Sequence, residues 1–500
     1  MAGKSSARKN SDAPAKVHHT MPVIPLFTAV TVYFGWGLLI FVGHIRDFFR
    51  RLFVHTSKTP VGYAPIVSDF EDFYTRRAYG RIHECWNRPI NSAPSAHISV
   101  IERERIGTVF PGYTLEVRET GRTNDCLNLG SYNYLGFGDN DSPTKPSVLA
   151  ALDQYSVTTC SSRSDVGTTP LHLQVEEVVA RYVGKEAAMV FSMGFGTNST
   201  GLPALMGPGT LLISDELNHA SIVVGARSSG AKIAVFKHSD VKDLERVIRK
   251  AIVDGQPRSH RPWRRIMIVV EGIYSMEGEM CPLAEIVALK KKYKCSLYVD
   301  EAHSIGAVGP TGKGVCEFTG VDPADVDVLM GTFTKSFGSV GGYIAADKHV
   351  IDYLRLHCMG SVYSPSISPP ACQQIIAAMK IILGEDGTDN GRQRLQAIYD
   401  NANYFRDELR NYGFHVLGEA GSPVVPVMLY VPSQIKHFST ESLARNLAVV
   451  VVGFPATPLL LSRVRFCISA AHTRKDLEDA IKKIKEVGDV LGLRYAQGAC

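Results

Sequence analysis

One lysine among small hydroxyl and glycine residues is the feature of this sequence that most directly indicates chemistry. Lys335 lies in the segment Gly331-Thr332-Phe333-Thr334-Lys335-Ser336-Phe337-Gly338, between Thr334 and a serine and close to Thr332. Upstream, Asp300 ends an apolar run that reads as a buried strand. A free amine, a carboxylate at a strand end and donors for a phosphate are what pyridoxal 5'-phosphate (PLP) requires. The pattern predicts a PLP enzyme in which Lys335 supplies the amine.

Two histidines extend this set. His303 closes the tetrad Asp300-Glu301-Ala302-His303, and His219 lies in Asn218-His219-Ala220-Ser221. Asp300 would keep the pyridine nitrogen protonated, His303 would hydrogen-bond the phenolic oxygen, and His219 would lie flat against the ring. Each of these residues alone is more often structural than catalytic, so the assignment depends on their combination.

The order and spacing of these segments resemble the α-oxoamine synthase family, fold-type I PLP enzymes that condense an amino acid with an acyl-CoA. The resemblance covers most of the chain. It implies that the turn Phe191-Ser192-Met193-Gly194-Phe195 binds the phosphate through the backbone N–H groups of Gly194 and Phe195, together with Thr332 and Thr334. It also implies that Asn133, in Ser131-Tyr132-Asn133-Tyr134-Leu135-Gly136, and Arg465, the second arginine of Arg463-Val464-Arg465, contact the substrate.

Three segments narrow the resemblance to the catalytic subunits of the serine palmitoyltransferase branch, with the plant forms most similar. They are residues 331–342, 453–461 and 270–279. The resemblance implies a decarboxylating condensation of L-serine with a long-chain acyl-CoA, in which Lys335 removes the α-proton. The implied partners are the non-catalytic long-chain-base subunit 1 in a heterodimer, a small activating subunit and regulatory ORM-type membrane proteins.

Composition agrees with an enzyme of this kind. The 500 residues suffice for two or three domains, and a 45% hydrophobic content excludes a largely disordered chain. The net charge of +5 is small for this length, which gives nucleic-acid binding little support. The ten cysteines are scattered without a metal-ligand spacing, so we expect no metal site and a reducing compartment.

The N-terminal region predicts membrane attachment. Residues 21–43 carry no charge, and a membrane span needs about 20 apolar residues. Ile45, Phe48 and Phe49 then recur at helical spacing opposite Arg46, which fits either a helix in the membrane surface or one packed on the catalytic domain. Four basic residues lie on each side of the span, so charge does not orient it. The resemblance implies the endoplasmic reticulum membrane, with the catalytic part facing the cytosol.

Apolar strands alternate with helical patterns after this region, as at 188–191, 211–214, 266–270 and 297–299. Such alternation predicts an α/β fold with a mostly parallel central sheet, here the fold-type I PLP-dependent transferase fold, followed by a smaller C-terminal α+β domain carrying strands at 424–431 and 448–452. The expected segments are a polar tail (1–20), a transmembrane or embedded helix (21–43), a juxtamembrane helix with the N-terminal segment (44–127), a PLP-binding large domain (128–360) and a small domain (361–500).

Two alternative functions compete with this interpretation. Another α-oxoamine synthase using glycine or alanine would share the fold, and amino-acid preference would discriminate between the two. A nucleotide-driven helicase is suggested only by the letters Asp300-Glu301-Ala302-His303. That alternative fails because the segment 309–314 lacks the spacing and the terminal hydroxyl of a phosphate-binding loop.

Overall fold

The structure is a computed structural model that describes residues 24, 26–53, 62–64, 66, 73, 79, 82–106 and 117–495. By internal contacts the chain divides into two units, residues 1–55 and 56–500. The expected polar tail, 1–20, lies outside the described residues.

The first unit contains one long helix, α1 (Leu26–Phe53). Its residues 26–49 are long and apolar enough to cross a membrane, and few of them are buried. The apolar stretch and the amphipathic residues after it therefore form one continuous helix. Length and composition alone support a membrane span, and a signal sequence passes the same test.

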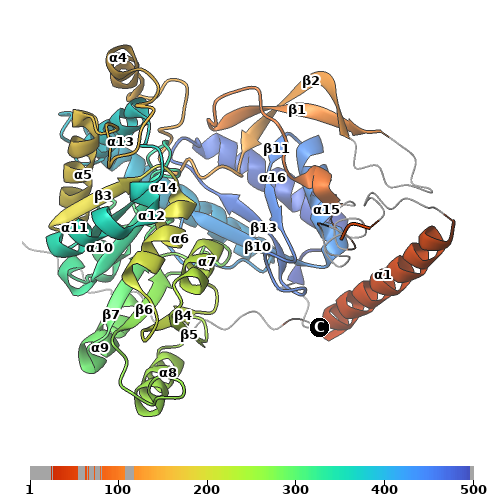
Figure 1. Cartoon of the computed structure of the whole chain (residues 1–500). Coiled ribbons are helices and arrows are strands. Elements are labelled where there is room, and N and C mark those ends of the chain that lie inside the picture. Colours follow the sequence, from red (N-terminus) through yellow and green to blue (C-terminus); the bar gives the residue numbers. More distant parts are fainter. Residues whose placement is uncertain are drawn as a thin grey trace, which may run out of the picture. The chain divides into compact units, whose positions relative to one another are not determined.

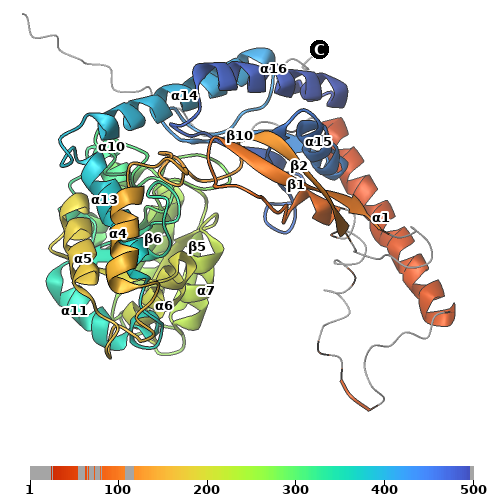
Figure 2. The same ribbon diagram turned by 90° about the horizontal axis from the view of Figure 1, so that it is seen from above.

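The second unit contains all the other elements (Figures 1 and 2). Its helices are α4 (Lys145–Tyr155), α5 (Pro170–Val183), α6 (Gly194–Leu205), α7 (Ala220–Ser228), α8 (Val241–Asp254), α9 (Leu283–Tyr293), α10 (Val315–Thr319), α11 (Lys348–His357), α12 (Met359–Val362), α13 (Pro369–Ile382), α14 (Asn390–Tyr412), α15 (Pro432–Ala444) and α16 (Arg474–Leu491), with 3-10 turns at η2 (His83–Cys85) and η3 (Pro323–Asp325). Its strands are β1 (His97–Arg105), β2 (Val117–Asn128), β3 (Ala187–Phe191), β4 (Leu211–Asp215), β5 (Lys232–Phe236), β6 (Ile266–Glu271), β7 (Ser296–Asp300), β8 (Val328–Thr332), β9 (Gly342–Ala346), β10 (Val424–Tyr430), β11 (Leu447–Ala448), β12 (Val450–Val452) and β13 (Ser462–Cys467).

The central sheet has seven strands in the order β3-β9-β8-β7-β6-β4-β5. The pairs from β8 to β5 are parallel, whereas β9 runs antiparallel to both of its neighbours. This confirms the mostly parallel sheet and the four strands predicted within it. Because the parallel strands end at the same edge, the residues that follow them are brought together there.

Both faces of this sheet are buried, which explains why its strands read as apolar runs. Ala188 and Val190 of β3 pack into one hydrophobic cluster, whereas the alternate residues Met189 and Phe191 pack into another. Helices cover the sheet on its two faces (Figure 1), as expected for a parallel α/β sheet.

The C-terminal part has a separate hydrophobic core around β10, β13, α14 and α16. The predicted strand 424–431 is confirmed as β10. The predicted strand 448–452 is two strands instead. Leu447 and Ala448 pair with β2, and Val450 to Val452 pair with β13 in the sheet β10-β13-β12. The apolar run is unbroken from residue 447 to residue 452, so it did not reveal that the pairing partner changes. The expected boundary at residues 360/361 stays a prediction.

Candidate functional site

The site is built where adjacent strands of the central sheet end. Asp300 is the last residue of β7 and pairs with Met330 of the neighbouring strand β8. The chain leaves β8 at Thr332 and turns through Lys335, so the amine returns toward the strand ends. The charges of Asp300, Glu271 and Arg465 each shift the pKa of Lys335, so these four groups form one cluster.

The amine of Lys335 lies beside an aromatic ring and among charged groups of both signs. Its Nζ lies 5.6 Å from the centre of the Tyr132 ring. Burial lowers the pKa of Lys335 to about 8, because the charged form is less well solvated, although Asp300 and Glu271 act in the opposite direction. The amine therefore has a neutral fraction near physiological pH far larger than an ordinary lysine has.

Asp300 is held in place by two hydrogen-bond donors. Its Oδ2 accepts from Nδ2 of Asn198 at 2.7 Å, and its Oδ1 accepts from the backbone N–H of Ala302 at 2.9 Å. Asn198 is itself held by Tyr298, whose hydroxyl donates to its Oδ1 at 2.8 Å. The carboxylate is buried and has no cationic partner within ion-pair distance among the described residues, so it is suited to a ligand group that carries a positive charge.

His303 is buried beside this carboxylate. Its Nδ1 lies 2.8 Å from the hydroxyl of Tyr134, and its ring packs edge-on against Tyr132 at 5.4 Å. Burial lowers the pKa of His303 well below its usual range, and Lys335 adds to the effect. The imidazole is therefore neutral, with one ring nitrogen fixed by Tyr134.

His219 caps the N-terminus of helix α7 and is fixed on two sides. Its backbone N–H donates to Oε1 of Glu271 at 2.5 Å, and its Nδ1 accepts the backbone N–H of Ser221 at 3.2 Å. Because Nδ1 is an acceptor, the proton of a neutral ring lies on Nε2. The ring itself is exposed and contacts Phe195 edge-on at 6.1 Å.

The predicted phosphate turn joins β3 to the N-terminus of α6, which begins at Gly194. A Cβ at Gly194 would lie 2.8 Å from Oγ1 of Thr332, so glycine is required for this close approach. Oγ1 of Thr332 lies 2.8 Å from Oγ1 of Thr334. Oγ1 of Thr332 donates to the carbonyl of Gly341 at 2.9 Å, so the Thr334 hydroxyl and the N–H groups at the helix start are the donors that suit a phosphate.

Arg465 reaches the same cluster from β13. Its guanidinium lies over the Tyr132 ring at 4.8 Å and donates to the Tyr132 hydroxyl. The side chain is only 5% exposed, its Nε has no hydrogen-bond partner, and no carboxylate pairs with it among the described residues. A buried arginine of this kind is suited to a carboxylate ligand.

Asn133 is a predicted site residue whose amide is fully committed to other parts of the protein. Its Nδ2 donates to the carbonyl of Pro94 and to Asp139, both at 2.9 Å, and its Oδ1 accepts from Gly138 at 3.0 Å. These bonds build a turn and leave the amide no spare donor. Its role in substrate binding stays a prediction, whereas its neighbours Tyr132 and Tyr134 point into the cluster.

Sequence reasoning missed four residues of this site. Tyr132, Tyr134, Asn198 and Glu271 each hold one of the predicted residues in place. Glu271 is the last residue of β6, beside β7. It could have been predicted in the same way as Asp300, as a carboxylate at the carboxyl end of a parallel strand. The burial of Glu271 raises its pKa well above the usual range, and Asp300 raises it further.

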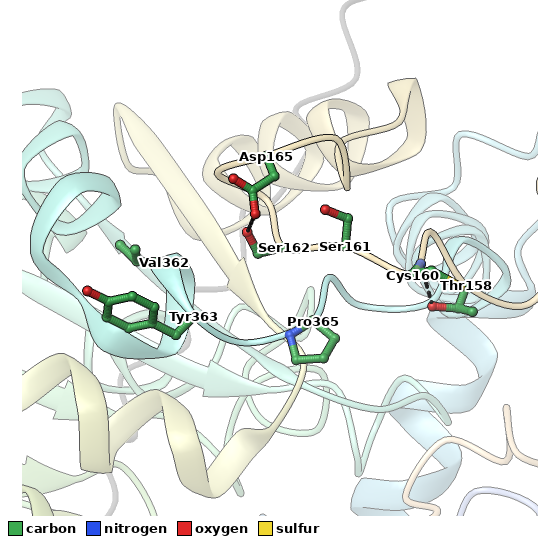
Figure 3. Close-up of a pocket in the computed structure, with 8 residues that line it drawn as sticks. All are labelled: Thr158, Cys160, Ser161, Ser162, Asp165, Val362, Tyr363 and Pro365. Carbon is green, nitrogen blue, oxygen red and sulfur yellow. Dashed lines mark hydrogen bonds between the residues drawn. The ribbon is translucent and has the colours of Figure 1, made fainter.

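A separate recess is lined by residues that do not belong to this cluster (Figure 3). Its volume is about 530 Å³ and its lining includes Cys160, Asp165 and Tyr363. None of the predicted site residues lines it. Cys160 is exposed and is not disulfide-bonded, and the other described cysteines are also free.

The lowered pKa of Lys335 predicts how the apoprotein takes up PLP. Only the neutral amine has a lone pair to attack a carbonyl, so the uptake rate should rise with pH and level off above about 8. An ordinary lysine would give a rise that continues to about 10.4. Stopped-flow absorbance between pH 6 and 10.5 measures this, and a profile that climbs without a break to pH 10 would contradict it.

Comparison with known proteins places the chain in a family. The model for aminotransferase class I and II matches residues 124–484. Long chain base biosynthesis protein 2a of Arabidopsis thaliana is 57% identical over 95% of this chain and 96% of its own length, and serine palmitoyltransferase 2 of Dictyostelium discoideum is 50% identical over 93% and 95%.

Solved structures give the same result. A serine palmitoyltransferase variant from S. paucimobilis, with bound PLP and myriocin, has a TM-score of 0.74 and 27% identity over 86% of this chain and 100% of that one. The chain therefore belongs to the aminotransferase class I and II family and, within it, to the group of long chain base biosynthesis protein 2 and serine palmitoyltransferase 2.

Proposed function

We propose that this chain is the catalytic subunit of a serine palmitoyltransferase, which condenses L-serine with palmitoyl-CoA and releases carbon dioxide and coenzyme A to form 3-ketosphinganine, the first step of sphingolipid biosynthesis. The observation that carries the proposal is the Tyr132 ring, which contacts the Lys335 amine and the Arg465 guanidinium together. An amino acid bound here would have its carboxylate at Arg465 while its α-carbon lies near Lys335.

The residues fit PLP as the cofactor. Lys335 would supply the amine, Asp300 would face the pyridine nitrogen, and the helix start at Gly194 and Phe195 with Thr332 and Thr334 would hold the phosphate. His219 would cover the ring and His303 would bind the phenolic oxygen. PLP, when bound, supplies an electron sink that stabilises negative charge at the substrate α-carbon.

The protein's own groups then move one proton and orient two charges. Lys335, partly neutral because of its lowered pKa, accepts the α-proton of the bound serine at Nζ. Arg465 holds the carboxylate in a fixed orientation through its planar fork. Asp300, oriented by the donors Asn198 and Ala302, would face the ring nitrogen of the bound cofactor.

Partners and location follow from the resemblance. The proposed assembly is a heterodimer with the non-catalytic long-chain-base subunit 1, joined by a small activating subunit and by regulatory ORM-type membrane proteins. The proposed location is the endoplasmic reticulum membrane, where α1 would span the bilayer and the catalytic unit would face the cytosol. Helix α1 is the feature that supports this, since a product with a long acyl chain partitions into membranes.

The test is a titration of the purified, PLP-loaded protein, with and without the partner subunit, by L-serine, glycine and L-alanine. We expect a change in visible absorbance that is strongest with L-serine, and a long-chain 3-ketone product when palmitoyl-CoA is added. A response selective for glycine or alanine would instead favour another α-oxoamine synthase. No response to any amino acid, in either preparation, would refute the proposal.

Deleting residues 1–53 should separate location from chemistry. The variant should move from the membrane pellet to the soluble fraction, because α1 carries the apolar span. Its response to L-serine in detergent should stay within about twofold of the full chain, since every site residue described above lies after residue 130. Fractionation and the absorbance titration measure the two effects, and a variant that stays in the membrane would contradict the assignment of α1.

A further inference from the structure

Two arginines on one face of β13 reach the same hairpin. Arg463 and Arg465 are two residues apart on a strand, so their side chains point to the same side. Nη1 of Arg463 donates to the carbonyl of Met276 at 2.8 Å, and Nη1 of Arg465 lies 3.5 Å from the carbonyl of Ser275 and 3.7 Å from the sulfur of Met276. The hairpin 272–281, closed by the bridge between Ile273 and Met280, is thus in contact with both arginines.

The two arginines differ in their ionic partners. Arg463 pairs with Glu277 at 3.0 Å, and both side chains are buried, at 0% and 6% exposure. Its Nε also donates to the carbonyl of Leu461 at 3.0 Å. Arg465 has no such carboxylate among the described residues. One arginine of the pair is therefore committed to the protein, and the other is available to a ligand.

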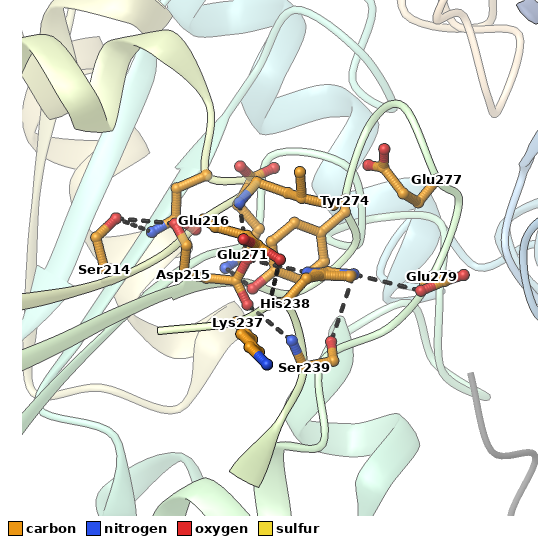
Figure 4. A network of polar contacts seen from close by, with 12 residues as sticks. Ser214, Asp215, Glu216, Lys237, His238, Ser239, Glu271, Tyr274, Glu277 and Glu279 are labelled. Atoms are coloured by element: carbon orange, nitrogen blue, oxygen red, sulfur yellow. Dashed lines mark hydrogen bonds and ion pairs between the residues drawn. The ribbon is translucent and has the colours of Figure 1, made fainter. Parts of the chain in front are cut away.

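The same hairpin is anchored on its opposite side by a second ionic contact (Figure 4). Glu279 lies 3.3 Å from Nε2 of His238, whose Nδ1 lies 2.9 Å from Asp215 at the end of β4. Burial alone would lower the pKa of His238, but its two carboxylate partners raise it to about 10, so the ring is a cation at physiological pH. The hairpin is thus held between the central sheet and β13.

Tight backbone packing leaves the hairpin little freedom. Gly278 has a φ of +69°, and a Cβ there would lie 2.7 Å from the carbonyl of Val424. Its own carbonyl accepts from the backbone N–H of Glu419 at 3.2 Å. Since β10 pairs with β13, a shift of these strands relative to the hairpin would break these contacts together with those of the two arginines.

We propose that the buried Arg463–Glu277 ion pair is a positioning device that sets Arg465 for the carboxylate of the substrate. Glu277 holds Arg463, which fixes the register of β13 against Ser275 and Met276, and these two residues form the wall on which the Arg465 guanidinium rests. The inference rests on the proposed function, because it deepens the role of Arg465. Arg463 and Glu277 act through Arg465 and touch no reacting atom.

The test is Glu277→Gln in the PLP-loaded full chain with its partner subunit, titrated with L-serine and with L-serinamide, which lacks the carboxylate. Loss of one buried charge–charge contact should misplace Arg465 and raise the dissociation constant for L-serine about tenfold, the size of one charge-assisted hydrogen bond. The dissociation constant for L-serinamide, the KM for palmitoyl-CoA and kcat at saturating L-serine should stay within about twofold.

Glu176→Gln is the matched control, because Glu176 is also a buried glutamate (7% exposed) with arginine partners, Arg163 and Arg355. Glu176→Gln should lower the midpoint temperature of unfolding without changing the ratio of the dissociation constants for L-serine and L-serinamide. Equal weakening of L-serine and L-serinamide binding by Glu277→Gln, or no weakening of either, would overturn the inference.

If Glu277→Gln does not retain PLP, Arg463→Lys decides, because it keeps the charge and loses the fork. A higher dissociation constant for L-serine, with that for L-serinamide unchanged, supports the positioning role. An unchanged ratio of the two dissociation constants overturns it. A wild-type protein that does not respond to L-serine refutes the proposed function itself, which separates that failure from failure of the ion pair.

Discussion

Lys335→Ala should reduce turnover at saturating L-serine and palmitoyl-CoA by about 10³-fold or more. The variant loses the amine that bonds the cofactor and the base that removes the α-proton, and a positioned general base alone contributes about 10²- to 10⁴-fold. The measurement is product formation by mass spectrometry over a time course long enough to detect the residual rate.

Two variants control this prediction. Lys335→Arg keeps the positive charge but has no amine with an accessible neutral form, so it should be as inactive as the alanine variant. Lys313→Ala removes an exposed lysine from a loop and should stay within about twofold of the wild type. If Lys335→Ala kept a tenth or more of the turnover, Lys335 would not be the base.

Asp300→Asn should lower kcat by about 10²- to 10³-fold, the range seen when one buried electrostatic group is removed from an active site. The side chain keeps its shape but loses the charge proposed to pair with the cofactor's ring nitrogen. Binding of L-serine should change much less, because Arg465 and not Asp300 is the proposed partner of the substrate carboxylate. Steady-state kinetics with L-serine varied would separate the two effects.

Asn198→Ala tests the same carboxylate with a smaller perturbation. It leaves the Asp300 carboxylate in place but removes the 2.7 Å hydrogen bond that orients it, and should cost about tenfold in kcat. The expected order is wild type, Asn198→Ala, then Asp300→Asn. A kcat for Asp300→Asn above that of Asn198→Ala would mean that the charge of Asp300 is not used.

Local sequence patterns predicted most of the large-domain framework. The strands β3, β4, β6 and β7 read directly as apolar runs because both faces of their sheet are buried. The strand edge then located Asp300, the segment of small residues located Lys335, and the family pattern located Arg465. β5, β8 and β9 were not predicted. β5 is partly exposed along its length, and β8 and β9 are short runs that contain a glycine.

The remaining features depend on contacts between distant residues, which a local pattern does not contain. Tyr134 meets His303 across 169 positions, and Asn198 meets Asp300 across 102. Asn133 shows the converse, since its place in a family motif did not reveal that Pro94, Gly138 and Asp139 occupy its amide. The role of each of these residues therefore depends on which side chain or backbone group it contacts in the folded protein.

The contact between Tyr132 and Arg465 also constrains how the protein is made. The two residues are 333 positions apart, and β2 receives its partner β11 from a similarly late part of the chain. A ribosome therefore completes the cofactor-binding sheet well before the strand that brings Arg465 exists. During that interval the edge of β2 and the apolar face of the C-terminal core are unpaired, which exposes a nascent chain to aggregation. Loss of the last two helices and β13 should thus yield a protein that chaperones retain rather than a truncated enzyme with weak activity.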